Sequence, residues 1–272
     1  MPNPLIHSTA IVSSLAQLDS SVTVGPFCIV GDHVQIGAGT SLAAHVVIEG
    51  HTSIGAANKF HANAVIGGPP QDKKYAGEPT RLVIGDRNTF RESVTVNCGT
   101  AQDAGVTTVG SDNWIMAYVH IAHDCVVGNQ SILANCTQLA GHVHVGDFAI
   151  LGGFTGVHQH CKVGAHAMAG VGSVVLHDIP PFVMVSGNSA QAHGINTEGL
   201  KRRGFSAQTI AQLRAAYKIL YKSGESFEKA RVLLAEQVKT LNESNDPLAV
   251  EASQSVAHLL SFLNLVTRGI VR

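Results

Sequence analysis

The hydrophobic positions of this chain follow a period of six residues. Stepping by six from Val12 to Ile66 meets ten apolar residues, and stepping by six from Val109 to Val175 meets another twelve. An α-helix repeats every 3.6 residues and a β-strand every two, so a period of six indicates a short strand followed by a corner. The chain between these two runs keeps the same kind of pattern but changes register.

Three such strands close one turn of a triangular prism, so that one coil holds 18 residues. Cys28, Cys125 and Cys161 occupy the small position two residues before an aliphatic one, and we expect them to be buried structural thiols. The pattern resembles the hexapeptide repeat of the left-handed parallel β-helix. The left hand is implied by that resemblance, because strand twist by itself favours right-handed crossovers.

Two stretches interrupt the repeat, and a helical pattern follows it. The sequence predicts a β-helix over residues 1–190, with inserted loops near 67–81 and 97–108, and a small α-helical bundle over 191–272. Ser206 and Ser226 are predicted N-caps, Gly224 a helix stop, and Pro247 the start of a third helix. Insertions in a solenoid gather on one face, which is often the binding face.

Composition limits the function classes. A formal net charge of −1 and a pI of about 6.9 argue against nucleic acid as a partner. No apolar run reaches the roughly 20 residues of a membrane span, and the N-terminus lacks a signal-peptide pattern. The five cysteines form no C-x-x-C pair, so we expect a cytoplasmic protein without a zinc site. From Glu198 onward there are 11 basic and seven acidic residues, a balance that suits a phosphate or an acidic partner and equally an ordinary solvated surface.

In a prism with coils of 18 residues, several histidines converge on one edge across adjacent coils. One column contains Asp124, His142 and His160, and the neighbouring column contains His123, Gly141 and Gln159. A histidine titrates near neutrality and can act as a general base, while a carboxylate can fix its tautomer. Sequence neighbours on a strand point to opposite faces, so Asp124 reaches His123 only if the pair lies at a corner. The remaining histidines that lack such company, among them His33, His51 and His166, are expected at the surface or at corners.

Metal ligation is the competing interpretation of this cluster. A carbonic anhydrase built on the same solenoid uses three histidines, two of them five residues apart. No two histidines here have that spacing, so we expect no metal site.

Six motifs carry a closer resemblance. They are "HIAHDC", "AGHVHV", "VHQHCKVGAH", "QDKKYAGEPTR", "FRESVTV" and "NTEGLKRRGF", and together they resemble the bacterial UDP-N-acetylglucosamine O-acyltransferases along essentially the whole chain. The resemblance implies an enzyme that transfers an (R)-3-hydroxyacyl group from acyl carrier protein to the sugar 3-hydroxyl, the first step of lipid A synthesis. It also implies a homotrimer with sites between neighbouring prisms. No metal or diffusible cofactor is implied, because the carrier protein brings its own phosphopantetheine.

The resemblance also assigns residues. His123 would be the general base, Asp124 its partner, and the Gly141 N–H would hold the thioester oxyanion. Residues that would contact the sugar, diphosphate or acyl group are Gln71, Asp72, Lys74, His120, His142, His158 and Gln159. The nucleotide would be held by Asn196, Glu198, Arg202 and Arg203. Val171 stands at the acyl-chain ruler, where a glycine admits longer chains, so we expect a shorter donor. Asn97-Cys98 departs from the family pattern, in which His-Arg is common.

Two alternatives remain at this point. A UDP-amino-sugar N-acyltransferase of the same pathway would normally carry an additional N-terminal nucleotide-binding domain, whereas the repeat here starts by Val12. A non-catalytic hexapeptide scaffold would need neither convergent histidines nor the arginine pair.

Overall fold

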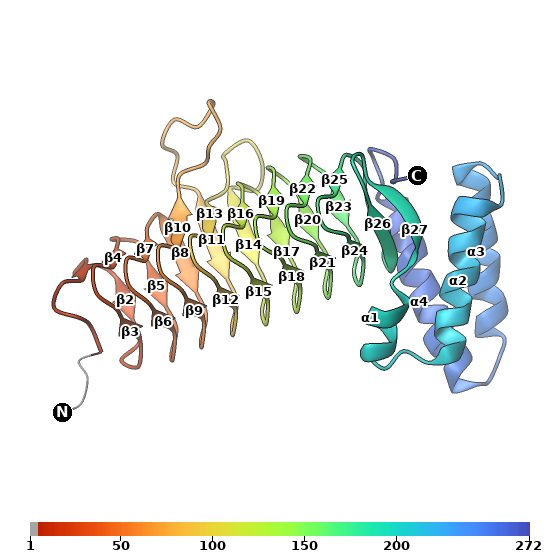
Figure 1. Ribbon diagram of the computed structural model, residues 1–272, viewed down its shortest axis with the longest axis horizontal. Coiled ribbons are helices and arrows are strands. Elements are labelled where there is room, and N and C mark those ends of the chain that lie inside the picture. The colour runs from red at the N-terminus through yellow and green to blue at the C-terminus, as the bar shows by residue number, and fades with distance from the viewer. Residues whose placement is uncertain (1–4) are drawn as a thin grey trace.

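The computed structural model describes residues 5–272 and shows a long solenoid followed by four helices (Figure 1). Short strands stack in three sheets, and each sheet takes every third strand of the chain until the solenoid ends. Sheet 1 contains β1 (Ile11–Val12), β4 (Ile29–Val30), β7 (Val47–Ile48), β10 (Val65–Gly68), β13 (Thr95–Asn97), β16 (His120–Ile121), β19 (Gln138–Leu139), β22 (Gly156–Val157) and β25 (Val174–Val175). Sheet 2 contains β2 (Gln17–Leu18), β5 (Gln35–Ile36), β8 (His51–Ile54), β11 (Arg81–Ile84), β14 (Val106–Val109), β17 (Val126–Val127), β20 (His144–Val145) and β23 (Lys162–Val163). Sheet 3 contains β3 (Thr23–Val24), β6 (Ser41–Leu42), β9 (Lys59–Phe60), β12 (Thr89–Phe90), β15 (Trp114–Ile115), β18 (Ile132–Leu133), β21 (Ile150–Leu151), β24 (Met168–Ala169), β26 (Val183–Ser186) and β27 (Gln191–Ile195).

The pairing within the sheets is parallel up to β26 and has the predicted period. His120 pairs with Gln138, and Ile121 pairs with Leu139, each 18 residues further along the chain. The prediction of a left-handed parallel β-helix of hexapeptide repeats, followed by helices, is confirmed.

The solenoid interior is a stack of aliphatic side chains. The second residue of each two-residue strand points inward, and Ile121, Leu133 and Leu139 are fully buried. Cys125 and Cys161 are buried as predicted, and burial raises the pKa of the Cys125 thiol to about 12 and that of Cys161 to about 11. Both thiols therefore remain protonated and serve as packing groups.

The three sheets meet at three edges, which we name by the sheets they join. Edge 1/2 carries the turns at 123–124, 141–142 and 159–160. Edge 2/3 carries those at 129–130, 147–148 and 165–166, and edge 3/1 those at 117–118, 135–136 and 153–154. Two insertions, loop 69–80 and loop 98–105, join β10 to β11 and β13 to β14, so both emerge from edge 1/2 (Figure 1).

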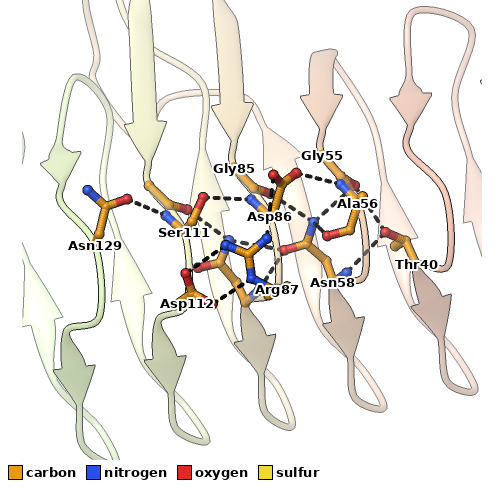
Figure 2. A network of polar contacts seen from close by, with 12 residues as sticks. Thr40, Gly55, Ala56, Asn58, Gly85, Asp86, Arg87, Ser111, Asp112 and Asn129 are labelled. Carbon is orange, nitrogen blue, oxygen red and sulfur yellow. Dashed lines mark hydrogen bonds and ion pairs between the residues drawn. The ribbon is translucent and has the colours of Figure 1, made fainter.

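A ladder of buried polar side chains runs inside edge 2/3 (Figure 2). The backbone N–H of Asn58 donates to the Thr40 hydroxyl, and the N–H groups of Asn88, Asn113 and Ser131 donate in turn to the carboxamide oxygen one coil before. The ladder satisfies corner amides that the parallel strands leave unpaired. It is continuous past both insertions, because these leave the solenoid at a different edge.

The C-terminal part consists of α1 (Thr197–Arg202), α2 (Ala207–Lys222), α3 (Phe227–Asn242) and α4 (Pro247–Asn264). Ser206 and Ser226 cap α2 and α3 through their side chains, as predicted, and Gly224 follows the end of α2 with a positive φ. The hairpin of β26 and β27 extends sheet 3 past residue 190. The predicted division of the chain into residues 1–190 and 191–272 stays a prediction.

The end of the chain returns to the solenoid. The Val271 N–H donates to the Asp178 carbonyl, and the Asp178 N–H donates to the Gly269 carbonyl. This return brings Arg268 to edge 1/2, where its guanidinium donates to the Gln159 carbonyl at 2.9 Å. Within residues 5–272, no helix combines the length and the apolar character that crossing a membrane requires.

Candidate active site

His123 and Asp124 lie in the turn of edge 1/2 that follows β16. Asp124 has a positive φ of 58°, and this left-handed corner lets two neighbouring side chains meet. The His123 Nδ1 lies 2.9 Å from the Asp124 Oδ2. An ionised carboxylate only accepts hydrogen bonds, so Nδ1 carries the proton, and the neutral ring has its unprotonated nitrogen at Nε2.

Gly141 lies one coil further along, directly beside the His123 ring. A Cβ at this position would stand 2.5 Å from the His123 Cε1 and 2.7 Å from its Nε2. Only glycine leaves room for the imidazole in this position. Across residues 5–272, the Gly141 N–H donates to no acceptor, so a backbone donor is free beside the basic nitrogen.

Two threonines, Thr100 and Thr107, form hydrogen bonds with Asp124. The Thr100 N–H and hydroxyl both donate to the Asp124 carboxylate, the hydroxyl at 2.6 Å, and the Thr107 hydroxyl accepts the Asp124 N–H at 2.8 Å. The Asp124 side chain is 1% exposed. A buried carboxylate is stable only when its oxygens are paired, and here the pairing fixes its orientation.

His142 lies next to His123 and forms a hydrogen bond with a different acidic residue, Asp103. Its Nδ1 lies 2.7 Å from the Asp103 Oδ2, and its ring stacks on His160 with 4.3 Å between centroids. The hydrogen bond from His142 holds the pKa of Asp103 below its usual range. Burial, His142 and Arg268 lower the pKa of His160. Thr100 and Asp103 belong to loop 98–105, which sequence analysis placed at a binding face without assigning either residue.

An apolar groove of about 390 Å³ runs along sheet 1 beside His123. Its lining is Ala122, Leu139, Ala140, Gly156, Val157, Val174, Val175 and Leu176, with His120, Gln138 and His158. The His120 Nδ1 lies 2.7 Å from the Thr95 hydroxyl, and burial, followed by His123, lowers the pKa of His120. The groove suits a flexible apolar chain.

A pocket of about 530 Å³ opens on the sheet 2 side of the same edge. It is lined by Asp103, His142, His144, His160, Lys162, Thr267 and Arg268. Lys162 and Arg268 form no ion pair within residues 5–272. The site therefore separates an apolar groove from a polar pocket that carries two unpaired cations.

The other predicted loop residues lie at the same edge but do not bond to His123. Gln71 and Lys74 are exposed on loop 69–80, and the Asp72 carboxylate accepts the Lys74 N–H at 2.9 Å. Asn97 and Cys98, where the family pattern changes, are buried at the base of the loops. Burial raises the pKa of the Cys98 thiol to about 11.

The predicted nucleotide residues lie away from His123 within one chain. The Asn196 side chain caps α1 and donates to the His166 carbonyl, while Arg203 donates to the Phe148 carbonyl at 2.8 Å. These contacts place α1 at edge 2/3, and Figure 1 shows α1 on the opposite side of the solenoid from the two loops. Arg202 is exposed on α1.

Three further predicted residues have distinct surroundings. Glu198 forms an exposed ion pair with Lys201 at 2.9 Å. Val171 lies at edge 3/1, is 78% exposed, and does not line the groove. The expectation that the remaining histidines have no neighbouring histidine is wrong for His33 and His51, whose rings stack with 4.2 Å between their centroids. That pair is 18 residues apart, so the coil period could have predicted it.

His123, Asp124 and His142 bring their ligand atoms within 4.8 Å of one another, which is close enough for a metal ion. Two imidazoles and a carboxylate are a chemically suitable donor set, so the expected absence of a metal stays a prediction. The Asp124 Oδ2 already accepts from the Thr100 hydroxyl and from the His123 Nδ1–H, so a metal would displace both hydrogen bonds. The observed bonding is that of a hydrogen-bonded acid–base pair.

Comparison with known proteins shows which family this chain belongs to. A bacterial transferase hexapeptide model matches residues 107–141, and the second-domain model of UDP N-acetylglucosamine O-acyltransferase matches residues 178–271. A protein of Thiobacillus denitrificans named acyl-[acyl-carrier-protein]--UDP-N-acetylglucosamine O-acyltransferase is 57% identical over 98% of this chain and 99% of its own. The chain belongs to this O-acyltransferase family.

Two further relatives support the same membership. A protein of the same name from Herminiimonas arsenicoxydans is 56% identical over 98% of this chain and 99% of its own. A solved structure of the Acinetobacter baumannii family member is 45% identical, with a TM-score of 0.91 over 99% of this chain and 100% of that one. The hexapeptide match includes His123, Asp124 and Gly141, and the second-domain match includes the four predicted nucleotide residues.

Proposed function

We propose that this protein transfers an (R)-3-hydroxyacyl group from the thioester of acyl carrier protein to the 3-hydroxyl of UDP-N-acetylglucosamine, the first step of lipid A synthesis. The observation that carries the proposal is the arrangement of His123, held by Asp124, with its ring against Gly141, whose N–H has no acceptor within residues 5–272. A base and an oxyanion donor side by side are what acyl transfer to a hydroxyl requires. Family membership supplies the substrates.

The reaction follows from these positions. The His123 Nε2 takes the proton of the sugar 3-hydroxyl as its oxygen attacks the thioester carbonyl carbon. Asp124 stabilises the imidazolium that forms, and the Gly141 N–H holds the oxyanion. When the tetrahedral intermediate collapses, the carbon–sulfur bond breaks and the thiolate of the phosphopantetheine arm takes up the proton from His123. The products are the ester and the free thiol, and no metal or diffusible cofactor enters the balance.

We assign the acyl chain to the groove on sheet 1 and the phosphate-bearing part of a substrate to the pocket on sheet 2. The groove is lined mainly by aliphatic side chains and ends near Leu176. Lys162 and Arg268 line the pocket and have no ion-pair partner within residues 5–272, which suits phosphate. His120 and His158 at the groove can contact the polar head of the acyl group.

We propose that the active unit is a homotrimer. Exposed aromatic and aliphatic side chains follow edge 3/1, namely Phe27, Tyr118, Phe154 and Val171, which are 56–78% exposed. Three prisms that bury this edge around one axis place sheet 1 of each copy against sheet 3 of the next. Edge 1/2 of one copy, with His123, then lies beside edge 2/3 of its neighbour, with Arg202. His123 and Arg202 lie apart within one chain, and in this arrangement the His123 of one copy and the Arg202 of its neighbour belong to one site.

We also propose that the protein acts in the cytoplasm. All five cysteines are free thiols, and four of them are buried packing groups, which suits a reducing compartment.

The test is an acyl-transfer assay with the purified protein, UDP-N-acetylglucosamine and hydroxyacyl carrier protein, in which the corresponding UDP-amino-sugar competes as acceptor. We expect the ester product, and a His123→Ala variant that folds and binds UDP-N-acetylglucosamine but turns over about 10² to 10⁴ times more slowly. His193→Ala, an exposed histidine on β27, is the matched control. A preference for the amino sugar, or a His123→Ala rate within about tenfold of wild type, would refute the assignment.

A further inference from the structure

Loop 98–105 is inserted into the repeat where the active-site coil begins, and its first residues bond to that coil rather than to solvent. The Thr100 N–H lies 2.9 Å and 3.1 Å from the two carboxylate oxygens of Asp124. The Thr100 hydroxyl lies 2.6 Å from the Oδ2, the same oxygen that faces the His123 Nδ1 at 2.9 Å. Thr100 itself is 1% exposed.

We propose that Thr100 is a positioning residue for the acyl transfer, acting on His123 through Asp124. This inference rests on the proposed function. The geometry supplies the reason: a carboxylate in a turn can rotate, and rotation would move the Oδ2 away from the imidazole. The two donors of Thr100 hold both oxygens at once and leave the Oδ2 aimed at Nδ1. A series of hydrogen bonds therefore runs from Thr100 through Asp124 to His123.

Other contacts of Asp124 do not replace this role. Thr107 accepts the Asp124 N–H and so fixes the backbone of the turn, not the carboxylate. The His142 Nδ1 is 3.9 Å from the Oδ2, beyond a hydrogen bond, because Asp103 of the same loop holds it at 2.7 Å. Thr100 is therefore the only residue besides His123 that donates to this carboxylate among residues 5–272.

The decisive variants are Thr100→Val, which keeps the shape and the N–H but loses the hydroxyl, and Thr100→Ser, which keeps both donors. The matched control is Thr155→Val. Thr155 is also fully buried and also donates a 2.6 Å hydrogen bond, but to the Gly152 carbonyl. Both valine variants lose a short hydrogen bond of a buried hydroxyl, so a fall in kcat in Thr100→Val alone would not be a general effect of removing such a bond.

We expect Thr100→Val to lower kcat by about 10²-fold with KM for both substrates unchanged, because a misplaced base affects the chemical step. Thr100→Ser should restore kcat to near wild type, and Thr155→Val should lower only the melting temperature. In an Asp124→Ala background, Thr100→Val should cause no further loss, because both changes remove the same interaction. A Thr100→Val enzyme with wild-type kcat, or an equal loss in the Asp124→Ala background, would overturn the proposal.

A second measurement separates this proposal from the proposed function. The imidazole nitrogen chemical shifts of His123, assigned by comparison with His123→Ala, report its tautomer without any turnover. We expect the Nδ1–H form in the wild type and a mixture of tautomers in Thr100→Val. A wild type that makes no ester refutes the proposed function alone, whereas unchanged shifts in Thr100→Val refute the role of Thr100 alone.

Discussion

Replacing Gly141 with alanine tests the geometry of the site most directly. The added Cβ would lie 2.5 Å from the His123 Cε1 and 2.7 Å from its Nε2. Carbon atoms in contact prefer about 3.5–4.0 Å, so the ring must retreat by about 1 Å. The Asp124 carboxylate holds the His123 Nδ1 at 2.9 Å and is itself held by Thr100, so the ring cannot retreat without disturbing this hydrogen bond. A misplacement of about 1 Å at a reacting group costs about 10²-fold in rate.

We therefore expect Gly141→Ala to lower kcat by about 10²-fold while the protein stays folded, at a stability cost of about 1–3 kcal/mol for the forced contact. The assay is steady-state acyl transfer, with melting temperature as the measure of folding. Gly31→Ala is the control, since the nearest atom to its added Cβ would be 3.5 Å away, an ordinary contact. A Gly141→Ala rate within about threefold of wild type would show that the ring does not need its present position.

Three further predictions concern other parts of the chain. Arg202→Ala should raise KM for UDP-N-acetylglucosamine with little change in kcat, because the exposed guanidinium suits phosphate and lies away from His123 of the same chain. Steady-state kinetics measure both constants, and a fall in kcat alone would contradict this prediction. Val171 lies outside the groove of a single chain, so a ruler role for it depends on the proposed trimer. If it has that role, Val171→Gly should shift the donor preference to longer hydroxyacyl chains, since forcing a chain into an occupied space costs typically about 1–3 kcal/mol. Competition between donors of different length measures the preference, and an unchanged preference would remove Val171 from the ruler role. His166, packed between Phe148 and Phe182, has its pKa lowered to about 4 by burial and by Arg203. The unfolded chain binds this proton more readily, so stability should fall as pH drops from about 6.5 to about 4, and His166→Phe should flatten the melting-temperature profile in that window; an equal slope in both proteins would speak against it.

The sequence by itself determined the solenoid, because its signal is repeated in every coil. An aliphatic residue every six positions from Val109 to Val175 is compatible with neither a helix nor a long strand, and each inward position repeats the same requirement for burial. The period also placed His123 beside Gly141, since residues 18 apart stack. Helix caps at Ser206 and Ser226 were predictable because capping depends on local chemistry alone.

Only the tertiary structure decided how the histidine is held. Thr100 and Asp103 lie in an insertion with no period, so nothing in the sequence relates them to Asp124 and His142. The contact of His123 with Asp124 depends on a positive φ at the corner, a conformation that is uncommon for residues other than glycine and that the packing of the coils holds here. Repetition determines a core from sequence, whereas an active site built from a turn, a loop and a returning C-terminal segment depends on long-range contacts that no local pattern encodes.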